Sequence, residues 1–192
     1  TSNIPFGDVS LFDPAFSSSR DPVRRQGAWA IHNYFFMKSV DLVRAGGLIA
    51  FITSQGMADA ERNRPVREWL MERCDLVAAV RLPNNLFTDH AGTEVGSDLI
   101  VLQKNSAARP LSERQRDFIE TRTLSNGITV NNSFRSLDRV VQTSAKVGTN
   151  PYGKPAMEFT HAGGVEGIAR ALADMLAEDM ERHFNRELYE SH

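Results

Sequence analysis

The stretch LVRAGGLIAFITSQGM, residues 42–57, decides the fold class. Its centre, GLIAFIT, is a continuous apolar run with β-branched and aromatic residues, which is typical of a strand covered on both faces. Upstream, apolar residues recur at helical spacing over 27–44, and Gly46 and Gly47 predict a left-handed stop. The apolar positions of that helix are Trp29, Ile31, Phe35, Phe36, Val40 and Val43. The pattern predicts a helix followed by a buried strand, as in α/β sheets.

The same pattern continues downstream. PVREWLMERC (65–74) carries a proline suited to a first helical turn and an apolar stripe that ends at Cys74. LVAAVRLP (76–83) has the composition of a second buried strand, and SDLIVLQKN (97–105) that of a third. The connection between these two strands has no helical period. We therefore predict an antiparallel return, so that the last strand is reversed relative to the others.

Two regions have weaker patterns. Residues 9–25 have no hydrophobic period and are predicted to form a loop. Residues 106–160 predict an irregular linker region, with one short helix capped by Ser112, a second over 134–147, and a loop or extended arm over 148–164.

The last segment, residues 161–192, predicts an amphipathic acidic helix. Its apolar residues recur every four positions from about Val165 to Leu188. Such a helix either packs on its own domain or docks onto another protein, and we expect the former.

The composition of the chain excludes several classes of protein and of functional site. With 192 residues, 41% of them hydrophobic, the chain fits one globular domain with a helical appendage. The single Cys74 excludes an internal disulfide framework, no Cys/His spacing predicts a metal site, and no apolar run reaches the ~18 residues of a membrane span. We expect a cytoplasmic protein. The net charge of −2 does not indicate a generic polyanion binder, but Arg20, Arg24 and Arg25 are candidate DNA contacts.

The opening stretch TSNIPFGD contains a candidate base-binding motif. Pro5 pushes Ile4 toward an extended conformation, so the Ile4 carbonyl has a defined direction beside the Asn3 amide oxygen and the Phe6 ring. These two acceptors suit an exocyclic amine, and the ring suits a base face, with stacking worth ~1–3 kcal/mol. Holding both amine hydrogens frees the nitrogen lone pair to attack an electrophilic methyl group. Taken alone, the stretch is equally a turn that starts a loop.

The order of these elements resembles the second half of the gamma-group adenine-N6 DNA methylases, which include the modification subunits of type I restriction systems. In that family an Asn-Pro-Pro-Tyr/Phe motif precedes a long helix, a Gly-Gly turn, two further strands and a reversed last strand. NIPFGD matches the motif, with Ile4 in place of the first proline, and the resemblance covers residues 1–105. More narrowly, the chain is similar to the methylase-like region of very large bacterial proteins that also carry a helicase module.

The resemblance implies the carboxyl-terminal half of a Rossmann-like, S-adenosylmethionine-dependent methyltransferase fold (1–105), with a carboxyl-terminal helical extension. Asn3, Ile4, Pro5 and Phe6 would form the catalytic motif. Phe6 and Phe87 would stack on the flipped adenine, and His90, Thr93 and Glu94 would lie near the pocket. The residues that bind the cofactor are expected upstream of residue 1, so that this chain alone would not bind it. DNA, that upstream half and a helicase module are the expected partners.

Two other readings stay open at this stage. The chain could be a degenerate methylase fold that serves as a DNA-binding or scaffolding module beside a helicase, with Ile4 as the symptom of lost activity. Alternatively, it could be an unrelated α/β domain whose long acidic helix binds a protein partner.

Overall fold

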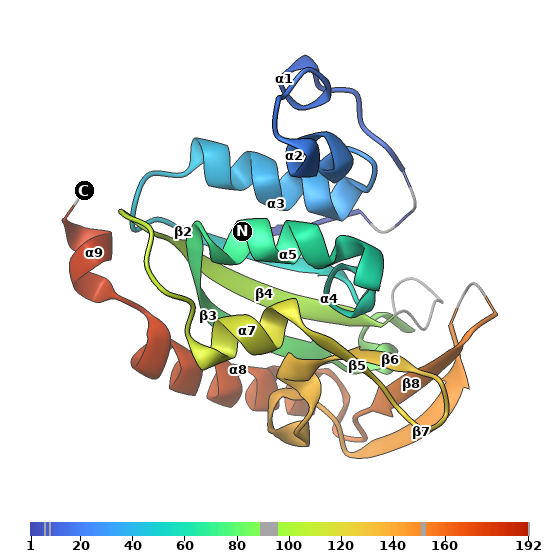
Figure 1. Cartoon of the computed structure of the whole chain (residues 1–192). Helices are drawn as coiled ribbons and strands as arrows, with labels where there is room; N and C mark the ends of the chain where they lie inside the picture. Colours follow the sequence, from blue (N-terminus) through green and yellow to red (C-terminus); the bar gives the residue numbers. More distant parts are fainter. Residues whose placement is uncertain (6, 8, 89–95, 151–152, 192) are drawn as a thin grey trace.

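The computed structural model describes residues 1–5, 7, 9–88, 96–150 and 153–191. A four-stranded sheet lies at its centre (Figure 1). The strand order is β1-β2-β4-β3, where the strands span Ser2–Asn3 (β1), Leu48–Ser54 (β2), Cys74–Leu82 (β3) and Ser97–Lys104 (β4). β1 pairs in parallel with β2, whereas β4 lies between β2 and β3 and runs antiparallel to both. The predicted α/β class is confirmed.

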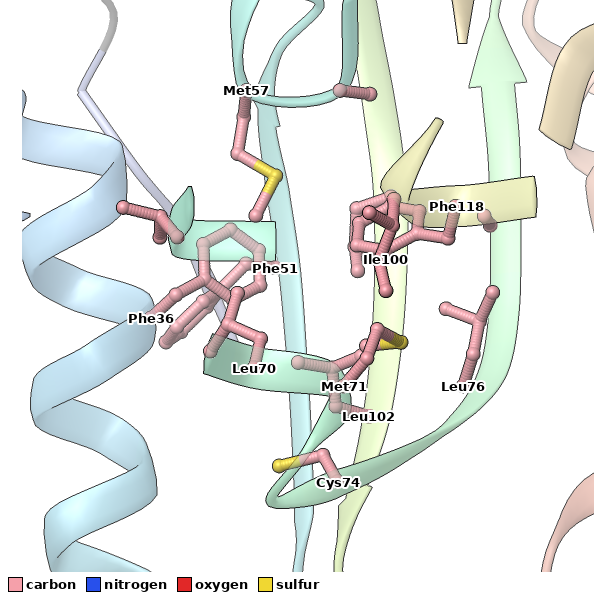
Figure 2. Close-up of a cluster of buried hydrophobic side chains, with 14 of the residues drawn as sticks. Phe36, Phe51, Met57, Leu70, Met71, Cys74, Leu76, Ile100, Leu102 and Phe118 are labelled. Atoms are coloured by element: carbon pink, nitrogen blue, oxygen red, sulfur yellow. The ribbon is translucent and has the colours of Figure 1, made fainter. Parts of the chain in front are cut away.

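Short and medium helices cover one face of the sheet. They are α3 (Ile31–Leu42), α4 (Gly56–Asp59), η1 (Glu61–Asn63), α5 (Arg64–Met71) and α7 (Glu113–Ile119). Figure 2 shows how side chains from α3, α5 and α7 meet those of the strands in the main core. Phe36 of α3 stands edge-on to Phe51 of β2, with 5.1 Å between the ring centroids. β2 alternates buried and half-buried residues, as a strand with one more deeply buried face does.

The long helix α8 (Gly164–His183) covers the other face of the sheet, under β3 and β4 (Figure 1). Its stripe contacts the strands through Ile168, Leu172, Met175, Leu176 and Met180. The expectation that the acidic helix packs on its own domain is therefore confirmed, and the reading of it as a free docking helix loses its main support.

The prediction of one helix as far as Leu188 is wrong. α8 ends at His183, and α9 (Arg186–Glu190) follows after a break. The amide of Gln103, buried in β4, donates to the Asn185 carbonyl and accepts from the Asn185 N–H, both at 2.9 Å. The Asn185 side chain then caps α9 by accepting from the Leu188 N–H. A tertiary contact thus redirects the chain where the apolar period alone would continue it.

The predicted loop over 9–25 is also wrong in part, because it holds α1 (Pro14–Ser17) and α2 (Pro22–Gly27). Both helices begin with an Asp-Pro pair. The aspartates, Asp13 and Asp21, cap the helices, and each proline stands in a first turn, where its missing N–H costs no hydrogen bond. Helices of four and six residues are too short to show a hydrophobic period, and the Asp-Pro pair is the sequence signal that marks the start of each.

The helices α3 and α5 are shorter than predicted. α3 begins at Ile31 rather than at residue 27, which leaves Trp29 before the helix and 68% exposed. Phe35 is exposed on the outer face of α3. α5 ends at Met71, and Cys74 is the first residue of β3 rather than the last of a helical stripe.

Residues 106–160 form more regular structure than expected. α7 has the predicted Ser112 cap, completed by Gln115 into a capping box. Two hairpins follow, β5 (Thr121–Thr123) with β6 (Thr129–Asn131) and β7 (Ser144–Thr149) with β8 (Pro155–Thr160). The predicted helix over 134–147 is wrong: η3 (Asn132–Phe134) and η4 (Leu137–Arg139) are single turns. The chain is then held extended because the Val141 N–H donates to the Arg81 carbonyl at the outer edge of β3.

No helix among the described residues has the length and apolar character needed to cross a membrane.

Candidate functional site

The Asn3-Ile4-Pro5 segment lies where β1 ends. Asn3 pairs in register with Ile52 of β2, and the Ile4 N–H donates to the Ile52 carbonyl at 3.0 Å. The Ile4 side chain is 2% exposed and belongs to the main core, while Asn3 and Pro5 on either side are exposed. In the described part of the chain, no residue donates to the Asn3 amide oxygen or to the Ile4 carbonyl. Neither acceptor at the carboxyl end of β1 is therefore occupied by a described residue.

Isoleucine at position 4 has a structural use. The N–H that a proline would lack extends the parallel ladder by one bond, and the side chain fills the core. Burial and this hydrogen bond fix the backbone of residue 4, as a proline ring fixes its own φ. The reading of Ile4 as a sign of decay therefore gains no support from its environment.

Polar atoms also gather at this end of the sheet, where β1 and β2 end and β4 begins. β2 leads through Gln55 into α4, and the Gln55 N–H donates to the carbonyl of Gly96, just before β4. Gln55 Nε2, Thr53 Oγ1 and Ser97 Oγ are buried and have no hydrogen-bond partner among the described residues. Buried polar atoms are normally paired, so these three atoms have unused hydrogen-bonding capacity at this end of the sheet. The sequence pattern gave no sign of these three residues.

A buried ion-pair network stabilises this end of the sheet. The Arg81 guanidinium, 2% exposed, donates to both Asp98 oxygens at 2.8 and 3.0 Å and to Asp59 at 2.9 Å. Burial by itself would lower the pKa of Arg81, but the carboxylates of Asp59 and Asp98 raise it above its ordinary value, so Arg81 stays charged. Asp59 also accepts from the Asn131 N–H. The network joins β3, β4, α4 and β6, and no local sequence motif predicts it.

Phe87, the predicted second stacking residue, lies in η2 (Asn84–Phe87), directly after β3. Asn84 accepts from the Phe159 N–H, and Asn85 exchanges two hydrogen bonds with the His161 backbone, so the β7–β8 hairpin holds this turn. β2 and β4 lie between β1 and β3, so the strands that lead to Asn3 and to Phe87 are about 14 Å apart at the usual strand spacing. β1 and β3 run in the same direction, so Asn3 and Phe87 follow the same ends of their strands, but these are the two outer strands and do not contact each other.

The other predicted pocket residues, Phe6, His90, Thr93 and Glu94, lie outside the described residues.

The three candidate DNA-binding arginines differ in their environments. Arg24 is 19% exposed, forms a two-pronged ion pair with Asp41 at 2.7 and 2.9 Å and lies over the Phe16 ring. Arg25 is exposed and donates to the Ser19 carbonyl. Arg20 is exposed, and no hydrogen bond or ion pair from it to another described residue is formed. Arg24 thus stabilises the fold, which leaves Arg20 and Arg25 as the accessible cations.

A cavity of about 380 Å³ lies elsewhere, between α7, η3, η4 and the end of α8. Four arginines line it, Arg114, Arg135, Arg139 and Arg182. Carboxylates offset their charge: Asp117 pairs with Arg135 at 3.2 Å, Asp179 with Arg139 at 3.1 Å and Glu178 with Arg182 at 2.9 Å. The charges balance, so we assign no ligand to this cavity. Among the described residues, no group of three His, Cys, Asp or Glu side chains could hold a metal ion.

Comparison with known proteins identifies the family. Residues 2–169 match the family model described as N-6 DNA Methylase. No curated protein matches the chain. One similar solved structure comes from work on complex assembly and conformational transition of the type I R-M system; it shares 18% identity, with 55% of this chain and 20% of that chain covered and a TM-score of 0.42. Another is a chain of a cryoEM structure of a DrdV–DNA complex, at 16% identity, 55% and 12% coverage and a TM-score of 0.34.

The chain therefore spans a fifth or less of the length of these two structures. The family match covers most of the sequence, from the first residues of β1 into α8. The chain belongs to the N-6 DNA methylase family.

Proposed function

We propose that this chain is the target-base side of an S-adenosylmethionine-dependent adenine-N6 DNA methyltransferase. In this proposal the exocyclic amine of an extruded adenine donates one hydrogen to the Asn3 amide oxygen and one to the Ile4 carbonyl. Pro5 limits the backbone after Ile4, and Phe6 and Phe87 flank the base. Extruding a base costs a few kcal/mol, which contacts in the pocket offset.

The observation that carries the proposal is the position of Ile4. Its N–H bond to Ile52 and its buried side chain hold residue 4 in place, with Asn3 exposed beside it. A carbonyl aimed before the substrate arrives needs no rearrangement during the reaction, which is the general advantage of preorganised acceptors and donors. With both amine hydrogens held, the nitrogen lone pair would be free to attack the methyl carbon of the donor sulfonium. The carbon–sulfur bond would break as the carbon–nitrogen bond forms, the thioether would leave, and the nitrogen would lose one proton to solvent.

The methyl donor of the family, S-adenosylmethionine, has no binding residues that we can assign in this chain. Glycine-rich turns after parallel strands are the usual cradle for such nucleotide-like cofactors. In the described residues, the parallel strand β2 leads through Gln55 and Gly56 directly into α4, without such a turn. We place the cofactor-binding half, and a helicase module, elsewhere in the same polypeptide, and take DNA as the substrate.

The test is transfer of a labelled methyl group from S-adenosylmethionine to adenine in DNA by the full-length polypeptide that contains this chain. Asn3→Ala should lower the transfer rate at least about a hundredfold, as the loss of one preorganised polar group does in other enzymes. Asn126→Ala, in the exposed turn between β5 and β6, is the matched control and should leave the rate unchanged. Equal rates for the wild type and Asn3→Ala, with both folded by circular dichroism, would contradict the proposal.

A further inference from the structure

Two large aromatic side chains are exposed at the amino-terminal helices. Phe12 is 85% exposed and Trp29 is 68% exposed. The Leu11 N–H donates to the Ala28 carbonyl at 2.9 Å, so the residues immediately before Phe12 and Trp29 are joined. Exposed apolar side chains that cluster on a surface are typical of contact sites, and this hydrogen bond brings the backbone segments that carry Phe12 and Trp29 together.

The scaffold under these rings is firmly held. Asp13, next to Phe12, caps α1 and accepts from Tyr34 Oη and Lys38 Nζ, both at 2.9 Å. Asp21 caps α2 and accepts from Trp69 Nε1 at 3.1 Å. Phe12 and Trp29 are thus exposed beside helices that are anchored to α3 and α5.

The aromatic pair lies toward the same end of the sheet as Asn3. α3 runs from Ile31, just after Trp29, to Leu42, and the Gly46-Gly47 turn then starts β2 at Leu48. α3 is therefore antiparallel to β2, and its beginning lies toward the carboxyl end of that strand. β1 is parallel to β2 and also ends there, at Asn3.

Charge favours a polyanion as the occupant. Arg25 lies in α2, four residues before Trp29, which follows the end of that helix, and Arg20 precedes α2; both arginines are exposed. Exposed aromatic rings interleaved with cations are the usual surface for unpaired nucleotides, in which bases stack on the rings and phosphates meet the cations.

We propose that Phe12 and Trp29 form a stacking platform for unpaired nucleotides of DNA, with Arg20 and Arg25 contacting the adjoining phosphates. This platform rests on the proposed function, because its role is to hold the DNA strand from which the target base is extruded. It adds a DNA contact outside the Asn3 motif and assigns two residues that the family resemblance does not.

The experiment is fluorescence titration of the chain with a single-stranded DNA of twenty nucleotides. Trp29→Phe keeps an aromatic ring and leaves Trp69 in place, so the difference between the wild-type and Trp29→Phe signals reports Trp29 alone. We expect DNA to quench that difference signal. Trp29→Ala and Phe12→Ala should each weaken binding about tenfold, the scale of one lost stacking contact. Trp29→Phe should bind almost as tightly as the wild type.

Leu42→Ala is the matched control, because Leu42 is 76% exposed at the far end of α3, and it should bind like the wild type. Arg20→Ala with Arg25→Ala should reduce the salt dependence of binding by about 0.7 per lost phosphate contact. The platform is overturned if DNA binds without quenching Trp29, or if Trp29→Ala binds with wild-type affinity. It is also overturned if quenching depends on protein concentration in the absence of DNA, which would indicate a second copy of the chain as the occupant.

The two proposals fail separately. Asn3→Ala should leave the Trp29 signal unchanged, because the titration needs no methyl transfer. If methyl transfer is lost in Asn3→Ala while Trp29→Ala binds DNA normally, only the platform fails. If Trp29 is quenched but no variant changes methyl transfer, only the proposed function fails.

Discussion

Residue 4 shows how one substitution can replace one kind of backbone restraint by another. An isoleucine here gains a hydrogen bond to β2 and a place in the core, both of which depend on β1 being parallel to β2 in one register. The carbonyl that the proposal needs is therefore positioned by the sheet rather than by a proline ring.

Replacing Ile4 by proline should destabilise the fold. Ile4→Pro removes the N–H, leaves the Ile52 carbonyl without that donor and reduces the buried apolar volume. We expect a loss of about 1–3 kcal/mol in the free energy of unfolding, measured by urea denaturation. Ile4→Val keeps the N–H and should cost only about 0.5–1.5 kcal/mol. Equal losses in the two variants would show that the hydrogen bond contributes nothing.

At the scale of elements, α1 and α2 exist because each begins with an Asp-Pro pair whose aspartate has two roles. One oxygen caps the helix, and the other accepts from a side chain of α3 or α5. A helix of four or six residues has little stability alone, so these outside contacts decide whether it forms. Phe16 of α1 completes the anchoring; it is fully buried, and its ring centroid lies 4.9 Å from that of Tyr34.

Acid should loosen this region. The Lys38 ammonium, then the Tyr34 hydroxyl and the Ala15 N–H, hold the pKa of Asp13 below its ordinary value. Since the folded-state pKa is the lower one, the ionised Asp13 contributes stability above the ordinary value of about 4, and that stability is lost as the pH falls through the folded-state pKa. The free energy of unfolding of the wild type should therefore fall more steeply below about pH 4 than that of Asp13→Asn.

Asn is as good a helix cap as Asp, so Asp13→Asn removes the charge while keeping the cap. Asp174→Asn, at an exposed position of α8, controls for the loss of one negative charge. If Asp13→Asn and the wild type keep the same pH slope, the ion pair with Lys38 contributes nothing to stability.

At the scale of the whole molecule, α8 belongs to the same folding unit as the sheet, although more than 50 residues separate it from β4. It covers the face opposite α3 and α5, so that β3 and β4 have helices on both sides (Figure 1). Gln103 of β4 fixes its end, and Ile168 packs near its beginning, against Val80 and Val141.

Truncating the helix stripe should therefore lower the stability of the entire domain. Ile168→Ala removes a side chain that is 3% exposed, and we expect a loss of about 2–5 kcal/mol in a single cooperative urea transition. Val165→Ala, on the same helix but 58% exposed, should change the stability by less than about 0.5 kcal/mol. A separate early transition in Ile168→Ala, with the sheet intact, would show that α8 is an independent appendage.

Local sequence determined the parts of this protein whose signal lies in neighbouring residues. Continuous apolar runs specified β2, β3 and β4, the capping pattern specified α7, and the order of motifs indicated the methylase family. These signals are readable because a buried strand or a capped helix needs its residue types at fixed short spacings.

Only the tertiary structure decided the rest. The use of the Ile4 N–H depends on β2, the end of α8 on Gln103, the extended chain at Val141 on the free edge of β3, and the Arg81 network on three other elements. Each of these contacts joins residues far apart in sequence, and its energy exists only once the sheet has formed. For this reason the sequence by itself indicated which segment carries the candidate chemistry, while the packing of the sheet determined how that segment is held.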